Sequence, residues 1–380
     1  MSNRTSTAQN GPDPRAQALV GSYVRAGYVQ IDPPVLQPAE PFLDLSGEDI
    51  RRRMFLTTDP QGREMCLRPD LTIPVSRAYL QSPEVGKPAG FCYLGPVFRH
   101  RPGASAEFLQ AGIESFARLD KAAADAEMLA LGLEATAQYG ATAPEIRIGD
   151  VGLFSAFIAA LDLAPAWKRR LIKDFNRKTS LKHDLNQLTL AAESPPEYQG
   201  VLAALSNSDP KAAHHLVTDL LSIAGIAAVG GRSVAEIADR FLEQAALNAP
   251  TRLPRETRAL IERFLAVGGD PDEAAAELRT LAADAKIALG PALDLFETRA
   301  GFLAARGVDV RAIKFSTGFG RGFGYYTGFV FELHDPRGKS ALVAGGRYDG
   351  LLSRLGARAP IPAVGFAASI EELTACGGAA

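Results

Sequence analysis

The sequence predicts an α+β protein, on three observations. Residues 91–100 and 107–116 read as two strands joined by a short loop. A second strand pair is predicted within residues 329–344, around the turn Asp335–Gly338, where proline fixes φ and glycine closes the turn. Residues 165–300 are rich in alanine and leucine and read as helices almost throughout. Strand pairs from both parts of the chain are therefore expected around a helical middle.

We expect four segments along the 380 residues. The first is polar and is expected to be disordered. The second and fourth hold the predicted strands and form the two parts of one core, and the third is a helical insert. In order, these segments are residues 1–14, 15–164, 165–300 and 301–380.

Composition and charge exclude several classes of protein. Apolar residues make up 47% of the chain and charged residues 22%, which is ordinary for a soluble globular protein. The net charge of −2 argues against a chain-wide nucleic-acid surface. Cys66, Cys92 and Cys376 are too scattered for a disulfide framework or a zinc site, and no apolar run reaches membrane-spanning length. We therefore expect a cytoplasmic protein without a metal, a cofactor or a membrane segment.

The first part of the core begins with a predicted helix and an edge strand. Residues 15–26 have helical spacing. Residues 28–34 form a strand that must end or lie at a sheet edge, because its prolines cannot donate to a central ladder. Farther along, residues 65–74 read as a strand that turns into a helix. Asp70 and Thr72 stand at this turn, where they either cap the helix or bind a ligand amine.

The second strand of the first pair carries polar residues on one face. Phe108, Gln110, Gly112 and Glu114 point to the same side, because side chains alternate along a strand. Glutamine and glutamate are costly in a core unless they form hydrogen bonds. This face therefore predicts a pocket that binds a polar ligand.

Glycines surround the predicted hairpin in the second part of the core. Arg321 lies among glycines and is followed by Tyr325 and Tyr326, and Tyr348 lies in the glycine-rich segment 345–350 after the hairpin. Glycine lets a ligand approach the backbone closely, and arginine and tyrosine side chains can bind it. A glycine-rich hairpin with ordinary core aromatics is the alternative.

Several motifs, taken together, resemble a known family. GPVFRHRPG…EFLQAGIESF resembles motif 2 of the class II aminoacyl-tRNA synthetases. LRPDLT, GRGFGYYTGFVFE, AGGRYDGL and PAVGFAASIEEL are similar to the corresponding segments of histidyl-tRNA synthetases, in the same order, and residues 28–34 match motif 1. The resemblance implies a class II synthetase-like core, which is a mostly antiparallel sheet flanked by helices, and a dimer formed through motif 1.

The resemblance also implies a histidine-binding pocket. Histidine offers an ammonium group, which needs acceptors, a carboxylate, which pairs with arginine, and an imidazole. In the synthetases a further arginine of motif 2 holds the α-phosphate of ATP. The residues carried over are Asp70, Thr72 and Gln110 for the ammonium, Arg321 for the carboxylate, Glu114 and Tyr326 for the imidazole with Tyr325 and Tyr348 nearby, and Arg99 for the motif 2 arginine.

Other positions depart from the synthetase pattern, and they concern ATP and tRNA. Glu372 stands where motif 3 has an arginine that binds the triphosphate. Exchanging attraction for repulsion costs about 4 kcal/mol for each sign at close range, with an effective dielectric near 20. Ala104–Ala106 replace a basic pair of the motif 2 loop, His100 stands in place of an acid, and Gly324 in place of an aspartate. Little sequence follows motif 3, so no anticodon-binding domain is expected.

This combination resembles the ATP phosphoribosyltransferase regulatory subunits, a family of synthetase paralogues. The resemblance implies a subunit without catalytic residues or aminoacylation activity. Such a subunit assembles with the short-form catalytic subunit as a hetero-oligomer and is required for activity and for histidine feedback in the first step of histidine biosynthesis. Histidine would act as an effector by binding one assembled state better than another. No tRNA partner is expected. A histidyl-tRNA synthetase-like enzyme that activates histidine with ATP is the alternative, and paralogues that bind an amino acid or RNA for other purposes remain open.

Overall fold

The computed structural model is described for residues 13–45, 48–175, 178–189, 218–219, 223, 254–321, 324–337 and 340–377. Of the segment 1–14, which is expected to be disordered, residues 1–12 lie outside the described residues. The chain forms two compact units. The first unit comprises residues 1–156 and 264–380, and the second comprises residues 157–263.

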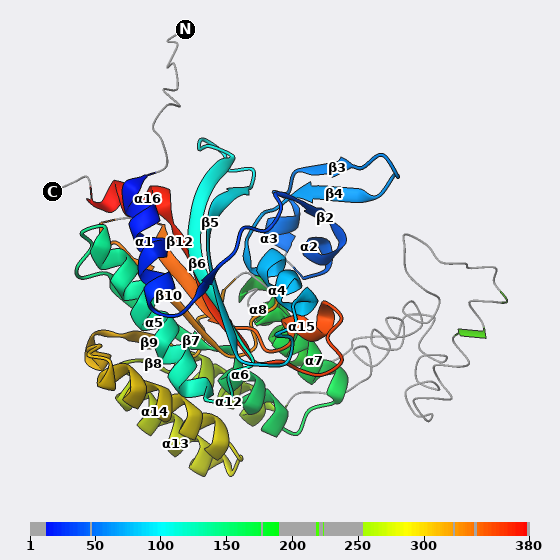
Figure 1. The fold of residues 1–380 in the computed structure, drawn as a ribbon. Helices are drawn as coiled ribbons and strands as arrows, with labels where there is room; N and C mark the ends of the chain where they lie inside the picture. Colours follow the sequence, from blue (N-terminus) through cyan, green and yellow to red (C-terminus); the bar gives the residue numbers. More distant parts are fainter. Residues whose placement is uncertain are drawn as a thin grey trace, which may run out of the picture. The chain divides into compact units, whose positions relative to one another are not determined.

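The first unit contains a sheet of nine described strands (Figure 1). Neighbouring strands are antiparallel except at β1–β5 and β7–β9, which are parallel. This agrees with the expected mostly antiparallel sheet. From one edge to the other the strands are β1 (Val29–Gln30), β5 (Ala89–Phe98), β6 (Glu107–Phe116), β12 (Ala363–Ser369), β11 (Ala341–Arg347), β10 (Phe329–His334), β7 (Glu145–Asp150), β9 (Lys314–Ser316) and β8 (Gly268–Gly269).

The two predicted strand pairs are present in this sheet and are separated by one strand. β5 pairs with β6, and β10 pairs with β11 in a hairpin, as expected. β12 lies between β6 and β11 and joins the pairs. The predicted strand near residues 28–34 is the short β1, and it lies at the sheet edge, where its following prolines cost no ladder bonds.

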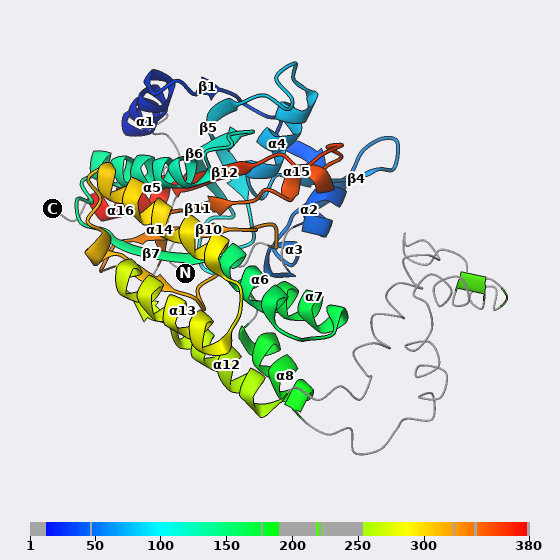
Figure 2. The same ribbon diagram turned by 90° about the horizontal axis from the view of Figure 1, so that it is seen from below.

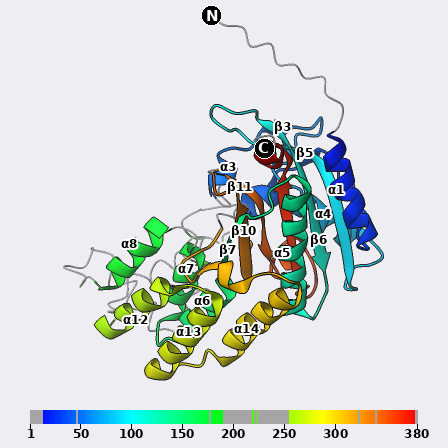
Figure 3. The same cartoon turned by 90° about the vertical axis from the view of Figure 1, so that its left-hand side faces the viewer.

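One face of the sheet packs on α1 (Pro14–Arg25) and α5 (Lys121–Gln138), as Figures 1 and 3 show. Phe331 and Leu333 of β10 point to this face, close to Gly132 of α5. Alternation then places Glu332 and His334 on the opposite face. The α5 face is mainly an apolar core with a few buried ion pairs, and Glu332 and His334 lie on the other face.

Smaller elements lie on the polar side of the sheet. Figure 2 shows α4 and α15 on the side of the strands opposite to α5. The chain forms two short helices, α2 and α3, before the short strand β3. These elements are a three-stranded sheet of β2 (Leu36–Pro38), β4 (Glu64–Leu67) and β3 (Leu56–Thr58), with α2 (Glu40–Leu45), α3 (Glu48–Arg51), α4 (Thr72–Gln81) and α15 (Leu351–Arg354).

The remaining described elements are mostly helices. Asp270 caps α13, as its Asp-Pro sequence indicates, by accepting hydrogen bonds from the N–H groups of Asp272 and Glu273. Among the described helices, none is both long and apolar enough to span a membrane. They are α6 (Val151–Ala160), α7 (Pro165–Asp174), α8 (Lys178–Thr189), α12 (Arg255–Ala266), α13 (Pro271–Ala285), α14 (Gly290–Ala305), a 3₁₀ turn at Val310–Ala312, and α16 (Ile370–Gly377).

A buried ion-pair network holds α14 to the core. Arg299 of α14 contacts Asp125 of α5 at 2.9 Å and Asp150 of β7 at 2.8 Å, and Asp125 also pairs with Arg347 of β11 at 2.7 Å. Buried charges are tolerated only when they are paired in this way. α13 lies within the expected insert 165–300 and α14 overlaps its end, and by their contacts both helices belong to the first unit.

Candidate ligand-binding site

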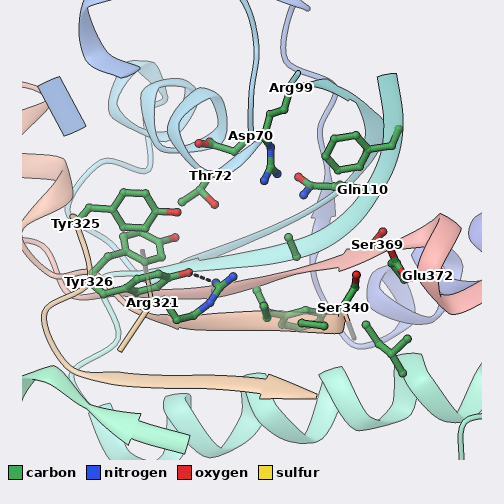
Figure 4. Close-up of a pocket in the computed structure, with 18 of the residues that line it drawn as sticks. Asp70, Thr72, Arg99, Gln110, Arg321, Tyr325, Tyr326, Ser340, Ser369 and Glu372 are labelled. Carbon is green, nitrogen blue, oxygen red and sulfur yellow. Dashed lines mark hydrogen bonds between the residues drawn. The ribbon is translucent and has the colours of Figure 1, made fainter. Parts of the chain in front are cut away.

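A cavity of about 200 Å³ lies on the polar side of the sheet (Figure 4). Its walls come from the turn before α4, from the loop that follows β5, from β6, β11 and β12, from Arg321, Tyr325 and Tyr326, and from the start of α16. Most of the residues carried over from the synthetase resemblance line this one cavity. They are Asp70, Thr72, Arg99, Gln110, Arg321, Tyr325, Tyr326 and Tyr348, together with Glu372.

Asp70 supports the helix start, one of the two roles that its position in the sequence left open, through only one of its carboxylate oxygens. One carboxylate oxygen, Oδ1, accepts a hydrogen bond from the N–H of Ile73 at 3.1 Å and so supports the start of α4. The other, Oδ2, is buried and has no hydrogen-bond partner among the described residues. Burial raises the pKa of the Asp70 carboxyl, although the Ile73 N–H and the charge of Arg99 act in the lowering direction.

Gln110 presents a second unsatisfied acceptor to the same cavity. It lies on β6 with 8% of its surface exposed, and within the described part of the chain its Oε1 atom has no hydrogen-bond partner. An unpaired buried acceptor costs about 1–3 kcal/mol. Asp70 and Gln110 border the same cavity in Figure 4, so one ligand donor group could satisfy both.

Two arginines supply positive charge to the cavity. Arg99 donates from Nε to the carbonyl of Pro69 at 2.7 Å, and burial lowers its pKa to about 10. Arg321 donates from Nη1 to the Tyr326 hydroxyl at 2.7 Å and from Nε to Glu332 at 3.1 Å (Figure 4). Both guanidinium groups are therefore held in place before any ligand binds.

Glu114 lies behind the cavity wall rather than on its surface. It is fully buried and accepts hydrogen bonds from Thr72 at 2.7 Å, from Tyr93 at 3.3 Å and from Tyr348. Burial raises its pKa to about 8. The facing residue of β12 is Gly365, whose added Cβ would lie 1.8 Å from the Glu114 carboxylate. Glu114 thus positions Thr72 and Tyr348, which do line the cavity.

Tyrosine rings form one end of the cavity. Tyr325 and Tyr326 are both buried, with ring centroids 4.8 Å apart, and Tyr325 meets Tyr348 edge-on at 5.8 Å. Contacts of this kind add about 0.5–1.5 kcal/mol beyond burial. The rings, inclined to one another by 51° and 75°, give this end an aromatic wall.

The other end of the cavity contains Arg101, for which no ligand-binding role was predicted. Arg101 and Phe108 line this end, with Glu372 nearby in the same wall. Arg101 pairs with Glu371 at 2.9 Å, and its guanidinium lies 4.0 Å from the centroid of the Phe108 ring. Phe108 lies on the β6 face that predicts the pocket, whereas Arg101 lies in the loop between β5 and β6, where strand alternation gives no signal.

Comparisons with known proteins agree on one family. A family model described as histidyl-tRNA synthetase matches residues 14–241 and 212–373. The ATP phosphoribosyltransferase regulatory subunit of Brucella canis is 39% identical over 351 residues, which are 92% of this chain and 93% of that one.

Solved structures show the same fold. An ATP phosphoribosyltransferase regulatory subunit/histidyl-tRNA synthetase from Bacillus halodurans has a TM-score of 0.67 at 22% identity, covering 99% of this chain and 83% of that one. A histidine–tRNA ligase subunit from Alicyclobacillus acidocaldarius has a TM-score of 0.58 at 24% identity, covering 100% and 98%. The class II synthetase-like fold expected from the sequence is therefore confirmed.

Proposed function

Because the chain belongs to the ATP phosphoribosyltransferase regulatory subunit family, we propose that it serves as the non-catalytic partner of an ATP phosphoribosyltransferase catalytic subunit. In this role it is required for the activity of the catalytic chain and transmits feedback by histidine. The proposal is supported by the Brucella canis relative, an ATP phosphoribosyltransferase regulatory subunit that matches this chain over nearly the whole length of both. The partner supplies the phosphoribosyltransferase chemistry, and this chain supplies regulation.

We propose that the cavity is the histidine sensor. The observation that carries this proposal is the pair of unpartnered buried acceptors, Asp70 Oδ2 and Gln110 Oε1, on one cavity. An ammonium group donates up to three hydrogen bonds and would satisfy both atoms. Arg321 and Arg99 supply charge for the carboxylate of the same amino acid. The tyrosine end would then receive the imidazole.

Absence of aminoacylation is part of this proposal. Glu372 lines the cavity at the end where a triphosphate would need positive charge. A carboxylate there opposes ATP by about 4 kcal/mol at close range with an effective dielectric near 20. The cytoplasmic location and the absence of a tRNA partner stay predictions from the sequence.

Self-association through motif 1 also stays a proposal. β1 is an edge strand, and Val29 on it is 60% exposed, with Val24 of α1 46% exposed nearby in sequence. Apolar residues at an unpaired edge favour contact with another chain. A second copy of this chain would cover them.

Titration calorimetry tests the sensor. L-Histidine should bind the chain, alone or assembled with the catalytic subunit. Histidinol, which lacks the carboxylate, and imidazolepropionate, which lacks the ammonium, should each bind at least tenfold more weakly, because each leaves one set of charges unmatched. ATP should not bind. Failure of L-histidine to bind both the free chain and the complex would refute the sensor, and tight ATP binding would restore the enzyme alternative.

A further inference from the structure

Arg101 is fixed by three contacts at the end of the cavity away from the tyrosines. Its Nε donates to the carbonyl of Ser105 at 2.8 Å, and its Nη2 pairs with Glu371 at 2.9 Å. Its guanidinium lies 4.0 Å from the centroid of the Phe108 ring. The ion pair joins the loop between β5 and β6 to the first turn of α16.

The Arg101 guanidinium lies over the aromatic ring of Phe108. Phe108 lines the cavity, and an aromatic ring at a cavity wall is a platform on which flat ligands stack. Here the chain itself places two guanidinium groups near the ring, that of Arg101 at 4.0 Å and that of Arg99 at 5.0 Å from the ring centroid, and a cation and a ring attract each other at such distances. A flat ligand would have to displace Arg101 from both Phe108 and Glu371.

The size of the cavity agrees with this covering. Its volume of about 200 Å³ lies below the ~300–1,000 Å³ of pockets that take drug-sized ligands. The unpartnered acceptors Asp70 and Gln110 border the same cavity and remain available to a ligand. The space therefore suits one amino acid better than an amino acid together with a nucleoside.

We propose that Arg101 and Glu371 form a latch that covers Phe108 and restricts the cavity to ligands the size of a single amino acid. The latch is a specificity determinant that acts separately from Glu372. Glu372 repels phosphate by its charge, whereas the latch keeps a flat ring, charged or neutral, from stacking on Phe108. The proposal rests on the proposed function only in taking an amino acid as the ligand of the remaining space.

Adenosine is the probe that separates the latch from charge repulsion, because it is flat and uncharged. It should show little or no binding to the wild-type chain by calorimetry or ligand-observed NMR. Arg101→Ala should raise its affinity by on the order of tenfold, the worth of one stacked base. Glu371→Gln, which keeps the guanidinium but removes its ionic partner, should give a smaller gain. Arg101→Ala combined with Phe108→Leu should lose the gain.

The matched control is Arg279→Ala, which removes an exposed arginine paired with Asp294 and Glu297 on α13 and α14. It should leave adenosine binding at the wild-type level. Unchanged adenosine affinity in folded Arg101→Ala and Glu371→Gln chains would overturn the latch, as would equal binding by the wild type. An L-histidine titration of the wild type, run in parallel, reports on the proposed function alone, so the two ideas can fail separately.

Discussion

Two sets of polar groups on the cavity wall are satisfied to opposite degrees. Asp70 and Gln110 keep buried acceptors without partners in the described structure. Arg101 and Glu371, in contrast, satisfy each other, and the Arg101 guanidinium lies over the Phe108 ring. An unsatisfied buried group favours a ligand that completes it, and a satisfied group resists one that would separate it. Under the two proposals, the same cavity binds an amino acid and excludes a nucleotide.

The largest effect on histidine binding is expected for Asp70→Asn. Removing the charge should lower L-histidine affinity by on the order of 100-fold, since hydrogen bonds to charged groups are worth about 1.5–3 kcal/mol. The asparagine oxygen can still accept from the N–H of Ile73, so α4 should persist. The ligand-free variant should be more stable than the wild type, because an unpaired buried carboxylate is removed. Calorimetry and urea unfolding give both numbers, and unchanged histidine affinity would contradict the role of Asp70.

A somewhat smaller effect is expected for Arg321→Ala. Losing the guanidinium should weaken L-histidine binding by roughly 30-fold and shift feedback inhibition to higher histidine, while assembly with the catalytic subunit persists. Size-exclusion chromatography and inhibition curves of the assembled complex measure the two properties. Arg279→Ala, an exposed arginine in its own ion pairs, is the control. Normal inhibition in Arg321→Ala would place the histidine sensor elsewhere.

The Glu114→Gln variant tests whether the buried carboxyl behind the cavity wall makes the stability of the chain depend on pH. The folded-state pKa of Glu114 is about 8, above the ordinary 4.5, so the folded chain binds the proton more tightly than the unfolded chain. The stabilisation of the folded chain that comes from this tighter proton binding is fully present below pH 4.5 and is lost as pH rises toward about 8. The free energy of unfolding falls by at most about 1.4 kcal/mol per pH unit in this window. The glutamine variant should show a flatter fall in unfolding free energy across this window. Parallel pH profiles for variant and wild type would mean that Glu114 does not titrate there.

No gain is expected from Glu372→Arg alone. Restoring positive charge at this position leaves the latch over Phe108 and the altered motif 2 loop in place. Histidine-dependent pyrophosphate exchange should stay at background. Measurable exchange by this single variant would show that one charge separates the chain from an active synthetase.

The alternation of side chains along strands predicts which residues share a face of the sheet, but it does not predict how far each side chain lies from the cavity surface. The period of two placed Gln110 and Glu114 on the same face of β6, and both are buried there. It could not show that Gln110 reaches the cavity while Glu114 stays behind the wall. That difference depends on Gly365, which lies on a strand far away in sequence and leaves room for the glutamate.

Contacts between residues far apart in the sequence could not be predicted either. Arg101 and Glu371 are 270 positions apart, and each alone looks like an ordinary surface charge. The helices near residues 271–305 had a clear local pattern, but their membership of the first unit depends on Arg299 meeting Asp125 and Asp150. Local sequence specifies an element, and only tertiary contacts specify its neighbours.

The strand order also constrains how the chain can be made. β6 ends at Phe116, but the strand that completes its free edge begins at Ala363, close to the end of the described residues. During synthesis the ribosome must therefore produce the whole intervening segment while one edge of β6 waits without a partner. Open strand edges invite pairing with other chains. We expect nascent chains stalled before residue 363 to be the aggregation-prone species and the main clients of chaperones.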